Sequence, residues 1–139
     1  EGDILFARSG ATVGKTFIYR KDWGECAYAG YLIKARINKK VYDPMFIYYY
    51  TKSDGYLQWI QSVTIQATIQ NVSAEKYSSL WFAIPPSLSE QKNIVEYLNQ
   101  ESNKIDTLIS KTEQAIERLE EYKTALISSV VTGKIKVQK

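Results

Sequence analysis

Apolar residues in the last third of the chain recur with the period of an amphipathic helix. One row repeats at intervals of seven residues and comprises Leu98, Ile105, Thr112, Leu119 and Leu126. Further apolar residues follow this row after three or four positions, among them Leu108, Ile109 and Ile116. A stripe of this width predicts a long helix that pairs with a second helix. The residues expected to make this pairing are Leu98, Ile105, Leu108, Ile109, Ile116, Leu119 and Leu126.

The ends of this helix carry separate signals. Pro85 and Pro86 stop an extended segment, and Ser87 with Glu90 forms a capping box that predicts a helix start. Gly133 is expected to cap the other end. The polar residues 99–103 leave two alternatives open, namely one continuous helix or a short helix followed by a long one. A helix over residues 103–131 alone would span roughly 42 Å.

The N-terminal part has the patterns of β-structure. Residues 4–8 and 15–19 are short apolar runs on either side of a glycine-rich turn at 9–14, which predicts a β-hairpin. Residues 28–38 alternate between apolar and polar, which predicts a strand with one core face and one basic, solvated face. The expected core face comprises Tyr31, Ile33, Ala35 and Ile37, and the expected solvated face comprises Lys34, Arg36 and Asn38.

Helical and extended segments are predicted to alternate between residues 43 and 84. Asp43 as N-cap and Pro44 at the first position predict a helix to about residue 53, with Phe46, Ile47 and Tyr50 facing inward. A second helical turn is expected over residues 56–60. Residues 63–72 are β-branched and amide-rich, and residues 80–84 are expected to form a last strand. We therefore expect an α+β protein with a mixed domain at residues 1–86 and a helical region at residues 87–139.

Composition narrows the possible chemistry. The chain has 139 residues, one cysteine (Cys26) and no histidine, so disulfides, zinc sites and histidine-based catalysis are not expected. No cofactor is expected either. No apolar run approaches the ~18 residues of a membrane span, and we expect a cytoplasmic protein. Because the chain begins at Glu1 rather than at methionine, we expect it to be part of something longer.

Charge separates the two regions. The net charge is +3, and it arises entirely in residues 1–86, where ten Lys and Arg face seven Asp and Glu. Residues 87–139 carry eight of each kind. The helix includes four glutamates close together, which would repel phosphates. Any contact with nucleic acid is therefore expected in the first region.

The loop at residues 10–16 superficially matches a nucleotide-binding P-loop. Only three residues separate Gly10 from Gly14, where the phosphate-binding pattern needs four, and the following residues 17–19 predict a strand rather than a helix. A hairpin loop is the preferred interpretation. Nucleic-acid contact is the alternative to plain packing for the amides of residues 66–71, since Gln and Asn read adenine, while Arg and Lys read guanine or contact phosphates. The candidate DNA-binding residues are Arg8, Lys15, Lys34, Arg36, Gln66, Gln70 and Asn71.

Three segments together resemble the specificity subunit of type I restriction-modification enzymes. Residues 2–15 are similar to the strand and glycine loop of a target recognition domain in that family, and residues 66–73 to its amide-rich segment. Residues 84–95, 104–109 and 131–135 are similar to its helical conserved region. The chain differs from an intact subunit, which has two recognition domains and two conserved helices.

The resemblance implies a non-catalytic module that reads one half of a split target in double-stranded DNA. It also implies that the helix pairs antiparallel with a second helix and helps to dock methyltransferase subunits, and through the complex restriction subunits. An isolated chain is expected to form a homodimer. The alternative is an oligomerisation module that binds no DNA and whose globular domain binds a protein or a small ligand.

Overall fold

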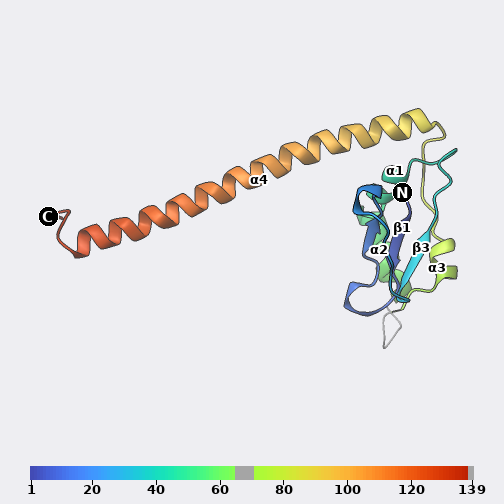
Figure 1. Ribbon diagram of the computed structural model, residues 1–139, viewed down its shortest axis with the longest axis horizontal. Coiled ribbons are helices and arrows are strands. Elements are labelled where there is room, and N and C mark those ends of the chain that lie inside the picture. The colour runs from blue at the N-terminus through green and yellow to red at the C-terminus, as the bar shows by residue number, and fades with distance from the viewer. Residues whose placement is uncertain (65–70, 138–139) are drawn as a thin grey trace. The chain divides into compact units, whose positions relative to one another are not determined.

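The computed structural model describes residues 1–64 and 71–137 (Figure 1). The chain divides into two compact units, residues 1–96 and 97–139. In chain order the elements are β1 (Ile4–Ala7), η1 (Gly10–Thr12), β2 (Thr16–Ile18), η2 (Lys21–Trp23), β3 (Leu32–Ala35), α1 (Pro44–Tyr50), α2 (Asp54–Thr64), α3 (Ala74–Ser78) and α4 (Leu88–Val131). This architecture confirms the predicted α+β class.

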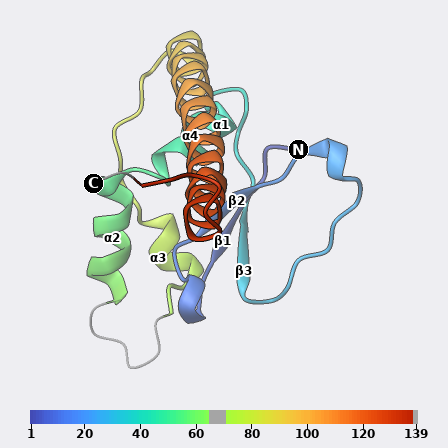
Figure 2. The same ribbon diagram turned by 90° about the vertical axis from the view of Figure 1, so that its left-hand side faces the viewer.

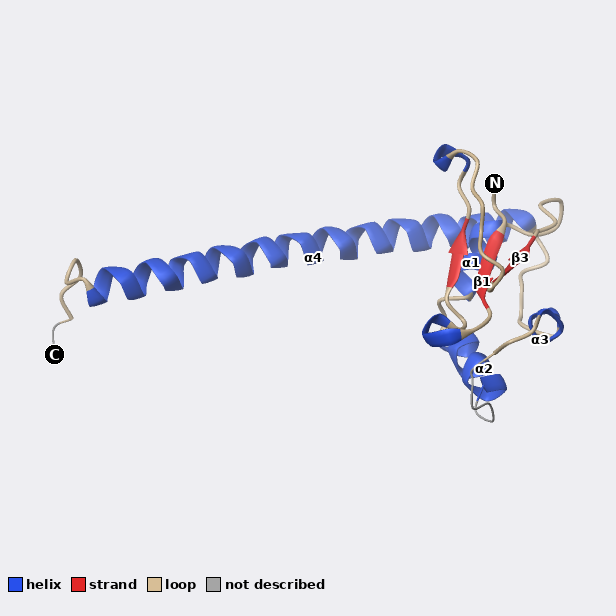
Figure 3. Ribbon diagram, turned by 60° about the horizontal axis from the view of Figure 1, so that its bottom comes forward, coloured by secondary structure: helices blue, strands red, loops and turns tan. Residues whose placement is uncertain are grey.

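The three strands form an antiparallel sheet in the order β2-β1-β3 (Figure 3). The hairpin predicted from residues 4–19 is therefore confirmed. In the register, Ile4 lies between Ile18 and Ala35, and Phe6 lies opposite Ile33. These side chains share one face because alternate residues of a strand point the same way. That face is the core face of the sheet.

The core fills the space between this face and the helices that follow. Its buried members are Ile4, Phe6, Ile18, Tyr56, Ile60 and Val72. In Figure 2, α2 and α3 lie on one side of the strands, and the loop between β2 and β3 lies on the other. Ile33, Ala35 and Ile37 pack against the core as predicted. Tyr31 was predicted to do so and does not, because β3 begins only at Leu32 and Tyr31 is 56% exposed.

The helix predicted after Asp43 is confirmed. The Asp43 carboxylate accepts hydrogen bonds from the backbone N–H groups of Met45 and Phe46, which satisfies the first amides of α1. Ile47 and Tyr50 pack against the core as expected. Phe46, also expected to face inward, is half-buried and is not part of the core cluster. The second helical turn is confirmed as the longer α2.

The prediction of a strand at residues 80–84 is wrong. This segment is irregular, although alternate side chains are anchored: Leu80 packs against the core, and Phe82 stacks on Tyr50 with ring centroids 4.1 Å apart. Trp81 between them is 91% exposed. Apolar and exposed side chains do alternate here, but no strand among residues 1–64 and 71–137 pairs with this segment. The short helix α3, which Ser73 caps by accepting from the N–H of Lys76, was not predicted.

The predicted long helix is α4, which runs without a break through residues 99–103. The alternative of two helices is therefore wrong. Ser87 accepts from the N–H of Glu90 at 3.4 Å, as the capping box requires. Gly133 has a φ of +76° and its N–H donates to the carbonyl of Val130, which confirms it as the C-terminal cap. At 1.5 Å per residue, 44 residues of helix span about 66 Å.

Candidate nucleic-acid interface

Three of the predicted DNA-binding residues lie at the end of the sheet where β1 leaves it and β2 enters. The Ala7 N–H donates to the carbonyl of Lys15 at 2.9 Å, so Lys15 stands beside the end of β1. Arg8 follows, and its Nε donates to Oδ1 of Asn71 at 3.5 Å. The backbone returns here from far along the chain, since Ser9 forms a β-bridge with Asn71. We call Arg8, Lys15 and Asn71 the sheet-end cluster.

A carboxylate modifies the charge of this cluster. Glu75 lies in the first turn of α3, and a hydrogen bond from the Ser73 side chain is the main cause that holds the pKa of its carboxyl below the usual value. The positive charge of Arg8 lowers this pKa further. Arg8 thus contacts the Asn71 amide oxygen directly and acts on the Glu75 carboxyl through its charge.

Lys34 and Arg36 lie elsewhere. Lys34 is on the outer face of β3, where its Nζ is 4.0 Å from a carboxylate oxygen of Asp3. Arg36 follows Ala35, which lies opposite Ile4 at the start of β1. Arg36 is therefore at the other end of the sheet from the sheet-end cluster. Gln66 and Gln70 lie outside the described residues.

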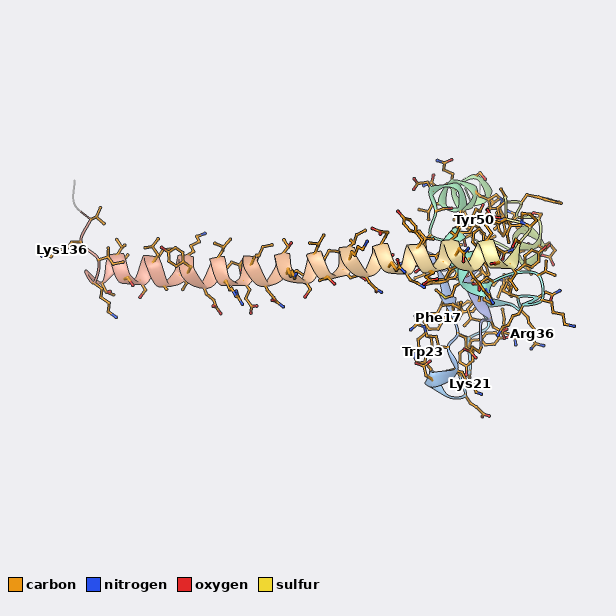
Figure 4. All side chains as sticks on the ribbon, turned by 90° about the horizontal axis from the view of Figure 1, so that it is seen from above. Phe17, Lys21, Trp23, Arg36, Tyr50 and Lys136 are labelled. Atoms are coloured by element: carbon orange, nitrogen blue, oxygen red, sulfur yellow. The ribbon has the colours of Figure 1, made fainter. Side chains whose placement is uncertain are left out.

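The outer face of the sheet carries an aromatic hollow of 840 Å³ that sequence reasoning missed. Phe17 stacks on Trp23 with ring centroids 5.0 Å apart, and both are about half exposed (Figure 4). Arg20 covers the Trp23 ring at 5.7 Å. Exposed aromatics beside cations are typical of surfaces that stack on bases. Asp3 and Glu25 also line this hollow, so its charge does not favour phosphates.

The glycine loop is not a phosphate cradle. The N–H groups of Val13, Gly14 and Lys15 donate to the carbonyls of Gly10, Ala7 and Thr12. These amides are therefore unavailable to an anion, and the strand β2 follows where a P-loop needs a helix. The hydroxyl of buried Tyr56 donates to the Gly14 carbonyl at 2.7 Å. Burial raises the pKa of Tyr56, which keeps this hydroxyl a neutral donor and fixes the turn.

The predicted pairing residues lie along α4, and most of their side chains are at least half exposed. Leu98 is half-buried. The exposed members are Ile105, Leu108, Ile109, Ile116, Leu119 and Leu126, with exposed fractions between 40 and 67%. A contiguous apolar row of this kind on a monomer is unusual unless another surface covers it.

Other chemistries find little support in the described residues. Residues 1–64 and 71–137 contain no group of three or more His, Cys, Asp or Glu side chains that could hold a metal ion. Cys26 is exposed and is not in a disulfide. None of the helices in these two ranges is long and apolar enough to cross a membrane.

Comparison with known proteins accounts for nearly the whole chain. It is 30% identical over 134 residues to the type I restriction enzyme StySPI specificity subunit of Salmonella potsdam, which covers 94% of this chain and 28% of that subunit. It is 29% identical over 136 residues to the EcoKI specificity subunit of Escherichia coli K12, with 96% and 29% covered. The chain therefore spans less than a third of the length of these relatives. No solved structure matches it.

The family described as "Type I restriction modification DNA specificity domain" matches residues 1–118. This range includes the whole sheet, all of its helical covering and more than half of α4. The segments from which a resemblance to specificity subunits was predicted, up to residue 109, lie inside it. The chain therefore belongs to the family of type I restriction-modification DNA specificity domains.

Proposed function

We propose that this chain is a non-catalytic, sequence-specific DNA-binding module of a type I restriction-modification system. Its globular part reads one half of a bipartite target in double-stranded DNA. The observation that carries this proposal is the sheet-end cluster, in which Arg8 and Asn71 meet across 63 residues of sequence beside Lys15. A cation next to an exposed amide can supply both phosphate contact and base readout.

The roles within the cluster follow from the chemistry of its side chains. Lys15 and Arg8 carry positive charge and fix the backbone of the duplex, while Asn71 offers an acceptor and a donor to a base edge. Lys34 and Arg36 are proposed as outer contacts because they do not share this end of the sheet. Gln66 and Gln70 are proposed as further readers.

The helical region, proposed as residues 87–139, provides assembly. Antiparallel pairing of α4 with another helix would cover the exposed apolar row, and the paired helices would dock methyltransferase subunits and, through the complex, restriction subunits. The names of the relatives support this part, since both are specificity subunits of restriction enzymes. With methyltransferase chemistry supplied by partners, the module itself needs no cofactor. Its place of action would be the cytoplasm, where the DNA is.

The test is binding of the full chain to duplex DNA at several salt concentrations. We expect the affinity to fall steeply with salt, because each neutralised phosphate contributes about 0.9 to the slope of log K against log salt. Arg8→Gln should lower this slope, whereas Arg118→Gln on α4 removes the same charge and should not. Asn71→Ala should instead change the sequences that the chain selects from random DNA. No affinity for duplex DNA at low salt would refute the proposal.

A further inference from the structure

A second hollow lies next to the glycine loop and has a different character from the aromatic one. It measures 490 Å³, and its apolar wall is formed by Val13, Leu57 and Ile60. Lys15, Thr51 and Lys52 provide its polar lining. No described carboxylate lines it. Two cations therefore face one concave surface without a counter-charge, which is the arrangement that an anion would favour.

Lys52 is held in place by the fold. Its Nζ donates to the backbone carbonyl of Thr16 at 3.1 Å and to the Thr16 hydroxyl at 2.9 Å. It also lies 4.4 Å from the ring centroid of Tyr48. An ammonium group has three donors, so one remains for a ligand. Because the side chain is already ordered, binding would cost little of its rotamer entropy.

Neither lysine is neutralised by an ion pair within the part of the chain that the structure describes. The ion pairs found there are Lys34 with Asp3 and Lys104 with Glu101. The backbone amides of the adjoining loop are occupied by internal hydrogen bonds. An anion in this hollow would therefore be held by the two ammonium groups alone, because the Thr51 hydroxyl already donates to the Tyr48 carbonyl.

The hollow adjoins the sheet-end cluster because Lys15 belongs to both. A backbone phosphate of a DNA strand could thus meet Lys15 and Lys52 while the next phosphate faces Arg8 and a neighbouring base faces Asn71. We propose that Lys15 and Lys52 together bind one phosphate of the DNA backbone, and that Lys52 is a DNA-contacting residue. This inference rests on the proposed function and adds a positioning contact to it.

The experiment uses the full chain and a 40-base-pair duplex of random sequence, with affinity measured from low to moderate salt. Removing one phosphate contact should lower the salt slope by about 0.9, which corresponds to about eightfold in affinity at 0.1 M salt relative to 1 M. We expect Lys52→Met, which retains the apolar stem against Tyr48, to lower the slope by up to this amount, because Lys15 still faces the same phosphate. Lys52→Arg should restore the slope. Lys40→Met in the turn before α1 is the matched control and should leave the slope unchanged.

Lys15→Met provides a second, independent variant, because Lys15 is exposed and its side chain is not needed to anchor the fold. Its slope should fall as that of Lys52→Met does, and the double variant should lose less affinity than the product of the two single losses, since both lysines serve one phosphate. If Lys52→Met unfolds, the Lys15→Met variant decides the question. A slope unchanged in the folded variants would overturn this inference while leaving duplex binding intact.

Inorganic phosphate at matched ionic strength separates the two sources of the anion. If it raises the melting temperature of the chain but the salt slope for DNA does not depend on Lys15 or Lys52, the site holds a free anion and the assignment to DNA is wrong. A chain that binds no duplex at all would instead overturn the proposed function. The two failures are thus distinguishable.

Discussion

Gln91 is the polar residue on which the start of α4 depends. Its side chain is only 1% exposed. Its Oε1 accepts from the N–H of Asp43 at 2.8 Å, and its Nε2 donates to the carbonyls of Val41 at 3.2 Å and Pro85 at 2.8 Å. One amide thus joins α4 to the loop before α1 and to the segment before α4 itself. We expect Gln91→Leu, which has a similar volume and no polar atoms, to destabilise residues 1–96.

The magnitude follows from the three hydrogen bonds. Each is worth about 1 kcal/mol net, and a buried group left without a partner costs about 1 to 3 kcal/mol. The Asp43 N–H and the Pro85 carbonyl lie in half-buried residues, whereas Val41 is exposed and its carbonyl can bind water. The expected loss in the free energy of unfolding is therefore about 2 to 5 kcal/mol. With a slope near 2 kcal/mol per molar urea, the midpoint should fall by roughly 1 to 2.5 M.

Tryptophan fluorescence during urea unfolding is the suitable assay. The chain has three tryptophans, Trp23, Trp59 and Trp81. All three lie in the unit of residues 1–96, so the fluorescence reports the unfolding of that unit and not of α4 beyond residue 96. Protein concentration must be fixed, because association would add to the apparent stability. The control is Gln58→Leu, the same substitution at an exposed position of α2 within the reported unit, which should stay within about 0.5 kcal/mol of the original.

A second substitution separates hydrogen bonding from size. Gln91→Glu keeps an acceptor for the Asp43 N–H but places an oxygen against two carbonyl oxygens, so it should destabilise at neutral pH as well. Equal midpoints for the original, Gln91→Leu and Gln91→Glu would refute the reasoning, because they would mean that water replaces all three bonds at no cost.

Three further predictions address association, the glycine loop and the helix length. Leu119→Ala should weaken self-association, measured by sedimentation, by about 30-fold or more, because a dimer loses the burial of two side chains at about 1 kcal/mol or more each. Glu113→Ala is the control and should not weaken it. If the unsubstituted chain is monomeric at tens of micromolar, the prediction is wrong. Gly14→Ala should lower the free energy of unfolding in urea more than Gly10→Ala. Both glycines have positive φ, but only at Gly14 would an added Cβ meet Ile60, at 2.8 Å. Equal losses would show that the contact relaxes. Seven residues inserted after Glu113 keep the apolar row in phase and lengthen the helix by about 10.5 Å. DNA rises ~3.4 Å per base pair, so the two half-sites selected from random DNA should move apart by about three base pairs. Unchanged spacing with retained binding would show that the separation is set elsewhere.

Local signals predicted the helix ends correctly. Asp43, Ser87 and Gly133 act through hydrogen bonds to residues within a few positions, so the chemistry that identifies them in sequence is the chemistry found in the structure. The hairpin was predictable for the same reason, since its two strands are joined by a short glycine turn.

Features that depend on distant partners were missed. The segment at residues 80–84 alternates like a strand, yet whether it pairs depends on a neighbour that sequence does not identify. Lys52 follows a short helix in sequence, and only its contact with Thr16, 36 residues earlier, places it beside the glycine loop. The same limit applies to the meeting of Arg8 and Asn71, which were predicted as candidates individually and not as a pair.

The sheet-end cluster joins a firmly held backbone to side chains that the fold does not require. The backbone of Arg8 is held on both sides by main-chain bonds, since its N–H donates to the Tyr31 carbonyl at 3.0 Å and its carbonyl accepts from the Val72 N–H at 2.8 Å. Main-chain bonds do not depend on side-chain identity, so substitutions at Arg8 or Asn71 should leave these backbone bonds in place. Gly14 is different, because its positive φ and its contact with Ile60 tolerate no side chain. The same few residues of chain therefore combine a fixed turn with replaceable side chains, so substitutions at the proposed DNA-contacting positions Arg8 and Asn71 should change DNA binding with little loss of stability.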